Sequence, residues 1–203
     1  LIDALQALNA GPGAIADLER AVTEILACFR PGRGNFLTDI YSRRIDRILI
    51  AATKADHLHH ESHDRLQAIV RRLADRAIAR ANFTGADVDV VAMAAVRATR
   101  EGTVKQGRET LPVIIGTPLE GERIGGEVFD GRTETAVFPG DLPEKAGAVF
   151  DEAVPRHDGI DPAIRFVRFR PPKLERTAEG VTLSLPHIRL DRALQFLIGD
   201  RLA

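Results

Sequence analysis

Four consecutive residues, Thr53-Lys54-Ala55-Asp56, have the types and spacing of a loop that recognises a guanine base. A carboxylate accepts two hydrogen bonds, and guanine offers a paired N1–H and N2–H₂ that adenine lacks. We therefore expect Asp56 to select guanine, while the methylene stem of Lys54 lies across the base and its ammonium reaches the sugar or the phosphate loop. Thr53 would brace the loop with its side-chain oxygen. The alternative is that Asp56 caps the helix that follows.

A short apolar run at 47–52 directly precedes this loop and is typical of a buried parallel strand. The pattern then predicts one amphipathic helix over 66–80 and a second strand over 88–92. Strand, helix and strand at this spacing favour a right-handed crossover between parallel strands. Because ligands of open α/β sheets bind where such strands end, the loop stands at the position of a ligand site.

The residues after the second strand are expected to complete the base pocket. GTPases place there a Ser-Ala-Lys-like turn, one of whose backbone N–H groups meets guanine O6. Ala94, Ala95 and Val96 occupy this position, although the usual serine and lysine are missing. We expect their backbone to contact the base, because small side chains let a ligand approach closely.

The sequence pattern divides the chain into three parts. We expect an α/β part over 1–102 that is helical at its N-terminal end, a β-rich subdomain over 103–186, and a C-terminal helix over 187–203 that packs back on the α/β part. Within the β-rich part, Asp130-Gly131 predicts the turn of a hairpin between 127–129 and 133–138. Further strands are expected near 112–116, 164–169 and 181–185.

Composition excludes several classes of protein. Lys and Arg number 28 against 29 Asp and Glu, so the net charge of −1 supplies no general field for a polyanion, and we expect no nucleic-acid partner. The single cysteine excludes an internal disulfide. No apolar run reaches the roughly 18–20 residues of a membrane helix. Because the chain starts at Leu1 and its one methionine is Met93, we expect a piece of a larger protein.

Several blocks of the sequence resemble the YcjX family of predicted P-loop NTPases. The blocks are Thr38-Asp39-Ile40-Tyr41, the run from Asp46 through Thr53-Lys54-Ala55-Asp56 to His57, Val96 to Arg100, Phe138 to Pro143, and Pro186 to Leu194. The resemblance implies a bacterial, cytoplasmic, stress-associated GTP-binding protein. It also implies the fold, which is the C-terminal part of a P-loop GTPase-like α/β domain with a β-rich insertion and a terminal helix.

The phosphate-binding loop that this family implies has no match among the 203 residues. The pattern G-x-x-x-x-G-K-[ST] is absent, and no Asp-x-x-Gly switch follows a strand in the first third. We therefore expect the chain to bind GTP or GDP through its base-recognition loops and to carry no catalytic residue. Mg²⁺ and hydrolysis would come only with the missing loop. Two alternatives stay open: a pseudo-GTPase without hydrolysis, and an interaction module for a partner protein or a membrane surface.

Two further clusters invite functional interpretations. The segment His57-Leu58-His59-His60-Glu61-Ser62-His63 contains zinc-ligand types, and His59 and His63 would share a face of a helix. We favour a solvated helix N-terminus there and assign no metal. An arginine-rich helix face over 65–80 could contact anions, but acidic residues interrupt it and we favour a solvated surface.

Overall fold

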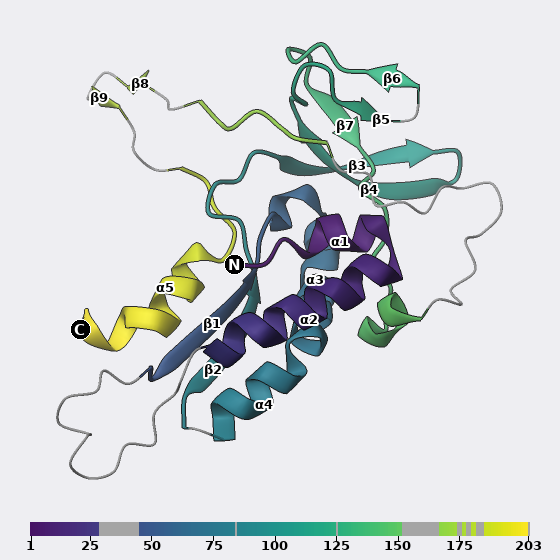
Figure 1. Ribbon diagram of the computed structural model, residues 1–203. Coiled ribbons are helices and arrows are strands. Elements are labelled where there is room, and N and C mark those ends of the chain that lie inside the picture. Colours follow the sequence, from purple (N-terminus) through teal and green to yellow (C-terminus); the bar gives the residue numbers. More distant parts are fainter. Residues whose placement is uncertain are drawn as a thin grey trace, which may run out of the picture.

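The computed structural model describes residues 1–28, 45–83, 85–124, 126–151, 167–173, 176–177, 180–181 and 185–202. Two parallel strands lie at its centre, β1 (Arg47–Ala52) and β2 (Asp87–Ala92), in register from Arg47 opposite Asp87 to Ala52 opposite Ala92 (Figure 1). On the other edge of β1, Ile2 forms an isolated parallel bridge with Ala52. The predicted parallel pair is therefore confirmed, within one residue at each end.

Helices cover one face of this sheet and a single helix covers the other (Figure 1). The first set comprises α1 (Ala4–Ala10), α2 (Pro12–Cys28), α3 (His63–Leu73) and α4 (Asp75–Phe83). Side chains alternate along a strand, so Ile50 and Val90 join the core below these helices, while Ala51 and Val91 pack with Ala193 of α5 (Leu190–Ile198). The carboxyl-terminal half of each strand is thus buried, as the apolar residues there predict.

One predicted helix is divided. The expected helix over 66–80 is found as α3 and α4, which meet at Ala74. The N–H of Ala74 donates to the carbonyl of Val70 at 3.0 Å and also to that of Arg71 at 3.2 Å. This tighter turn ends α3 before Asp75 begins α4. The apolar face survives the break, because Ile69, Val70 and Ile78 all lie in the same core.

A β-rich part follows the second parallel strand. β3 (Arg100–Gln106) and β4 (Glu109–Gly116) form a long antiparallel pair, and β7 (Thr135–Val137) pairs with β4 on its other edge. The shorter pairs are β5 (Arg123–Ile124) with β6 (Glu127–Val128), and β8 (Arg176–Thr177) with β9 (Gly180–Val181). This part has its own small core of Ile114, Phe129, Val137, Val167 and Phe169.

The predicted hairpin around Asp130-Gly131 is wrong. Residues 127–128 form an antiparallel pair with the preceding strand at 123–124, and residues 135–137 pair with β4. Asp130 instead closes a local turn, because its carboxylate accepts hydrogen bonds from the N–H groups of Arg132 and Thr133 and from the Thr133 hydroxyl. These bonds lower the pKa of Asp130 to about 2. Side-chain bonding of this kind competes with a two-residue hairpin turn.

Some of the other expectations fall on residues outside the described part of the chain or stay untested. Residues 164–166 and 182–184 of the strands expected near 164–169 and 181–185 lie outside the described residues, as does the resemblance block at 38–41. The division after residue 102 stays a prediction, and β3 runs across this position from Arg100 to Gln106. Among the described residues, no helix combines the length and apolarity needed to cross a bilayer.

Candidate functional site

Two loops meet at the carboxyl ends of β1 and β2. Residues 53–57 follow β1 and residues 93–99 follow β2. The N–H of Met93 donates to the carbonyl of Ala52 at 2.8 Å, and the N–H of Ala55 donates back to the carbonyl of Met93 at 3.2 Å. Parallel pairing therefore brings the two predicted base-recognition loops to one edge of the sheet.

Asp56 lies in this contact and is 5% exposed. Its Oδ2 accepts a hydrogen bond from the backbone N–H of Ala98 at 3.0 Å, and the Thr99 hydroxyl donates to its carbonyl. The carboxylate is thus engaged across the site rather than by the N–H groups of a following helix. The helix-cap interpretation of Asp56 is wrong. A carboxylate has about four acceptor positions, so the Ala98 bond leaves it able to accept from a ligand.

Lys54 has an unusual backbone. Its φ is +63°, in the left-handed region, and Arg189 is the other non-glycine residue with positive φ in the described part of the chain. The Lys54 ammonium lies 2.6 Å from Oδ2 of Asp3, which follows the residue bridged to β1. Sequence reasoning missed Asp3, because 51 positions separate it from Lys54 and no local pattern links them.

Thr53 braces its loop through the backbone of Ile2. The N–H of Thr53 donates to the Ile2 carbonyl at 2.9 Å, and the Thr53 hydroxyl donates to the same oxygen at 3.3 Å. The predicted bracing thus has a concrete partner. It fixes the loop against the N-terminal segment rather than against the second loop.

The three residues expected to meet guanine O6 differ in what their backbones do. The N–H of Ala94 already donates to the carbonyl of Ile188 at 3.1 Å, in a bridge that ties the loop to the segment before α5. That donor is therefore not available to a base, which corrects the expectation for Ala94. Ala95 and Val96 are exposed beside it and remain candidates.

The histidines near this loop are held in different ways. The i, i+4 face expected for His59 and His63 is not formed, because α3 begins only at His63. Nε2 of His63 donates to the carbonyl of Ala55 at 2.8 Å, and burial lowers the pKa of His63. Burial also lowers the pKa of His57, against the opposing charge of Asp56. The His57 ring packs edge-on against Phe169, so the loop also touches the β-rich part.

One group of ligand atoms is close enough to consider a metal ion. His59, His60 and Glu61 each offer one atom within 4.8 Å of the others, and the buried Nδ1 of His59 has no hydrogen-bond partner in the part of the chain that the structure describes. His60 is engaged elsewhere, because its Nδ1 lies 2.5 Å from Oε2 of Glu101. The assignment of no metal stays a prediction.

The arginine-rich face of α3 and α4 makes internal contacts. Arg65 donates to the carbonyl of Leu142 at 3.0 Å, and Arg71 and Arg72 lie 3.7 and 3.3 Å from the carboxylates of Asp89 and Asp75. These contacts engage three arginines of the face within the protein, and the solvated surface expected there stays a prediction.

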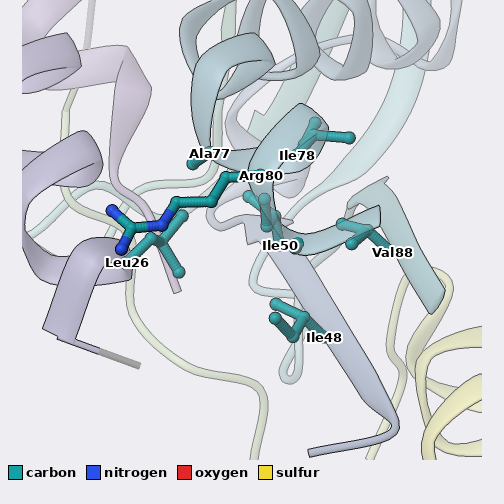
Figure 2. Close-up of a pocket in the computed structure, with 8 residues that line it drawn as sticks. Leu26, Ile48, Ile50, Ala77, Ile78, Arg80 and Val88 are labelled. Atoms are coloured by element: carbon teal, nitrogen blue, oxygen red, sulfur yellow. The ribbon is translucent and has the colours of Figure 1, made fainter. Parts of the chain in front are cut away.

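Two apolar spaces beside the sheet lie away from Asp56. One is a gap of about 10 Å³ that is lined by Ile48 and Ile50 of β1, Val88 of β2 and Ile78 of α4 (Figure 2). Its size and apolar lining make it a packing gap. The other, about 560 Å³, runs between α2 and β1 and reaches Leu1 to Asp3 at one end. Neither is lined by Thr53, Lys54 or Asp56.

Comparison with known proteins gives a consistent result over the whole chain. The model of the YcjX-like family, DUF463, matches residues 1–202. A protein of Escherichia coli strain K12 described as Ras-like GTPase YcjX is 34% identical over 204 residues, which cover 100% of this chain and 39% of that protein. A protein of Shewanella oneidensis with the same description is 29% identical over 203 residues and is covered to 38%. The chain thus spans about two fifths of the length of these relatives.

Proposed function

Because the chain belongs to the YcjX-like family, we propose that it supplies the base-recognition part of a guanine-nucleotide pocket in a GTPase-like domain. The pocket lies at the carboxyl ends of β1 and β2. Asp56 reads the base, Lys54 covers it, Thr53 braces the loop, and the backbone of Ala95 and Val96 meets O6. Two relatives described as Ras-like GTPases support a guanine ligand.

The observation that carries this proposal is the buried carboxylate of Asp56 at the end of a parallel strand. The Ala98 N–H donates to this carboxylate at 3.0 Å, and the Thr99 hydroxyl donates to the backbone carbonyl of the same residue. Together the two bonds hold Asp56 in place. A carboxylate held in place costs little further ordering when a ligand binds, and burial strengthens its hydrogen bonds. The paired N1–H and N2–H₂ of guanine match its remaining acceptor positions.

Phosphate chemistry is assigned to the longer protein. The 203 residues contain no glycine-rich loop with its lysine, so we assign none of them to the β- and γ-phosphates or to Mg²⁺. A protein as long as the relatives has room for that loop. We propose that such a longer protein hydrolyses GTP and has a stress-associated role in the bacterial cytoplasm.

A second candidate function has its own supporting observation. The base loop touches the β-rich part at two places, Thr99 beside β3 and Phe169 against His57. A partner that binds the β-rich part would therefore bind with different affinity when nucleotide occupies Asp56, and the reverse would hold equally. Measuring partner affinity in GDP and in nucleotide-free buffer tests this function, and equal affinities would reject it.

The experiment for the first function is a calorimetric titration of the full-length protein with GDP, GTP, ADP and ATP. We expect the guanine nucleotides to bind more tightly than the adenine nucleotides. Binding without turnover would favour the pseudo-GTPase alternative. Equal affinity for both bases would reject guanine recognition.

A further inference from the structure

The ion pair between Asp3 and Lys54 links the N-terminal segment to the proposed base pocket. The two side chains meet at 2.6 Å, and their exposed fractions are 30% for Asp3 and 49% for Lys54. We propose that Asp3 is a positioning residue, which holds the Lys54 ammonium so that the lysine stem covers the nucleobase. This inference rests on the proposed function and adds to it a determinant of nucleotide affinity outside the two recognition loops.

The backbones of both residues are already fixed where the ion pair forms. Thr53 donates two hydrogen bonds to the Ile2 carbonyl, and the N–H of Ile2 donates to the carbonyl of Ala51 at 2.7 Å. Asp3 and Lys54 are the next residues along each segment. An ordinary surface ion pair loses much of its energy in ordering two long side chains between mobile backbones. Here that ordering cost is reduced, so the pair can define one lysine conformation.

The conformation of Lys54 also points to a positional role. A non-glycine residue in the left-handed region is strained, and such residues persist where surrounding contacts over-determine them. Lys54 is held on one side by the Thr53 bonds to Ile2 and on the other by the bond from Ala55 to Met93. From this fixed backbone the Lys54 side chain reaches Asp3, whose Oδ2 lies 2.6 Å from the ammonium.

Asp3 retains a feature that stability alone does not explain. Its Oδ1 is buried and has no hydrogen-bond partner among the described residues. A buried acceptor without a partner is unfavourable for folding. A neutral side chain at this position would lose less free energy of folding through burial. The negative charge of Asp3 is therefore best explained by its attraction for the Lys54 ammonium.

The role predicts a specific division between affinity and selectivity. Asp56 reads the hydrogen-bonding edge of the base, whereas Lys54 contacts its face, which guanine and adenine share. Loss of Asp3 releases the ammonium and weakens the covering of either base. We therefore expect Asp3→Asn to raise the Kd for GDP about tenfold while the ratio of ADP to GDP affinity stays unchanged.

A double-mutant cycle on the full-length protein tests this inference. The variants are Asp3→Asn, Lys54→Met, which keeps the stem without the charge, and the double substitution, with Asp17→Asn as a control on an exposed carboxylate. We expect the double variant to bind GDP no more weakly than Lys54→Met alone, and the control to bind like the wild type. Asp3→Glu, which keeps the charge, is expected to restore part of the affinity and guards against a folding defect in Asp3→Asn.

Two results would overturn the inference and are distinguishable from failure of the proposed function. If Asp3→Asn binds GDP within twofold of the wild type, or if its effect adds fully to that of Lys54→Met, Asp3 does not act through Lys54. If the wild-type protein shows no preference for GDP over ADP, the proposed function itself fails, and the inference fails with it.

Discussion

The backbone N–H of Ala98 donates to the Asp56 carboxylate at 3.0 Å, across 42 positions of sequence. The neighbouring Thr99 hydroxyl donates to the Asp56 carbonyl, and β3 begins one residue later at Arg100. The residue proposed to read the base is therefore held directly by the start of the β-rich part. A change at this junction should alter both stability and nucleotide binding.

Replacing Thr99 with valine keeps the shape of the side chain and removes its hydroxyl. The buried carbonyl of Asp56 then loses its donor, which should lower the free energy of unfolding by about 1–3 kcal/mol and weaken GDP binding. Urea denaturation and calorimetry measure the two effects. Thr103→Val, at an exposed position of β3, is the matched control. Wild-type stability and affinity in Thr99→Val would show that this bond does not hold the loop.

A methyl group at Gly116 should disturb the same junction from the other side. A Cβ there would lie 2.8 Å from Cδ1 of Phe169 and 3.2 Å from the carbonyl oxygen of Ala98. Phe169 cannot move freely, because its ring packs against His57 and the small core of the β-rich part. Gly116→Ala should therefore destabilise the protein by about 1–3 kcal/mol in thermal or urea denaturation.

Gly126→Ala is the control for this substitution, because a Cβ at Gly126 meets no atom of the described residues within 4 Å. It should unfold close to the wild type. Equal stability of both glycine variants would contradict the packing described at Gly116.

Protonation of His63 should make stability depend on pH. Burial lowers the pKa of His63 in the folded protein, and its Nε2–H donates to the Ala55 carbonyl. Below the unfolded pKa of about 6.5 the unfolded chain binds more protons, so stability is complete above that pH and falls as the pH drops toward the folded pKa. His57 acts in the same direction.

Urea denaturation between pH 7.5 and 5.5 measures this loss. We expect His63→Gln, whose amide can still donate to Ala55, to lose less stability over this range than the wild type. His187→Gln changes an exposed histidine and should leave the wild-type slope. An unchanged slope in His63→Gln would show that His63 does not govern the effect.

The parallel strands could be predicted because burial on both faces leaves a continuous apolar signal. The run expected at 47–52 is β1, and the run at 88–92 is β2. β3 gave no such signal. Its residues 103–105 are exposed and include polar Thr103 and Lys105, so its pairing with β4 comes from tertiary context rather than from pattern. The failed hairpin at Asp130 has a local cause instead, because hydrogen bonds to the Asp130 side chain decide the turn.

The candidate site could be predicted only where its residues are consecutive. Thr53, Lys54 and Asp56 form one local motif, and the strand before them gives its position. The other contacts of this loop come from residues far away in the sequence. Asp3 lies 51 positions from Lys54, and Ala98 and Thr99 lie 42 and 43 positions from Asp56, so no spacing rule reveals them. The hydrogen bond from the Ala94 N–H to the Ile188 carbonyl could not be predicted for the same reason.

The most direct test of guanine recognition by Asp56 exchanges its carboxylate for an amide. In Asp56→Asn the amide would donate to the C2 carbonyl of xanthine and accept from its N1–H, whereas it would face the N2–H₂ of guanine with a donor of its own. Calorimetric titration of the full-length wild-type and Asp56→Asn proteins with guanosine and xanthosine diphosphates measures the exchange. We predict that the wild type prefers guanosine diphosphate and that Asp56→Asn prefers xanthosine diphosphate. Unchanged base preference in a folded Asp56→Asn protein would contradict the account.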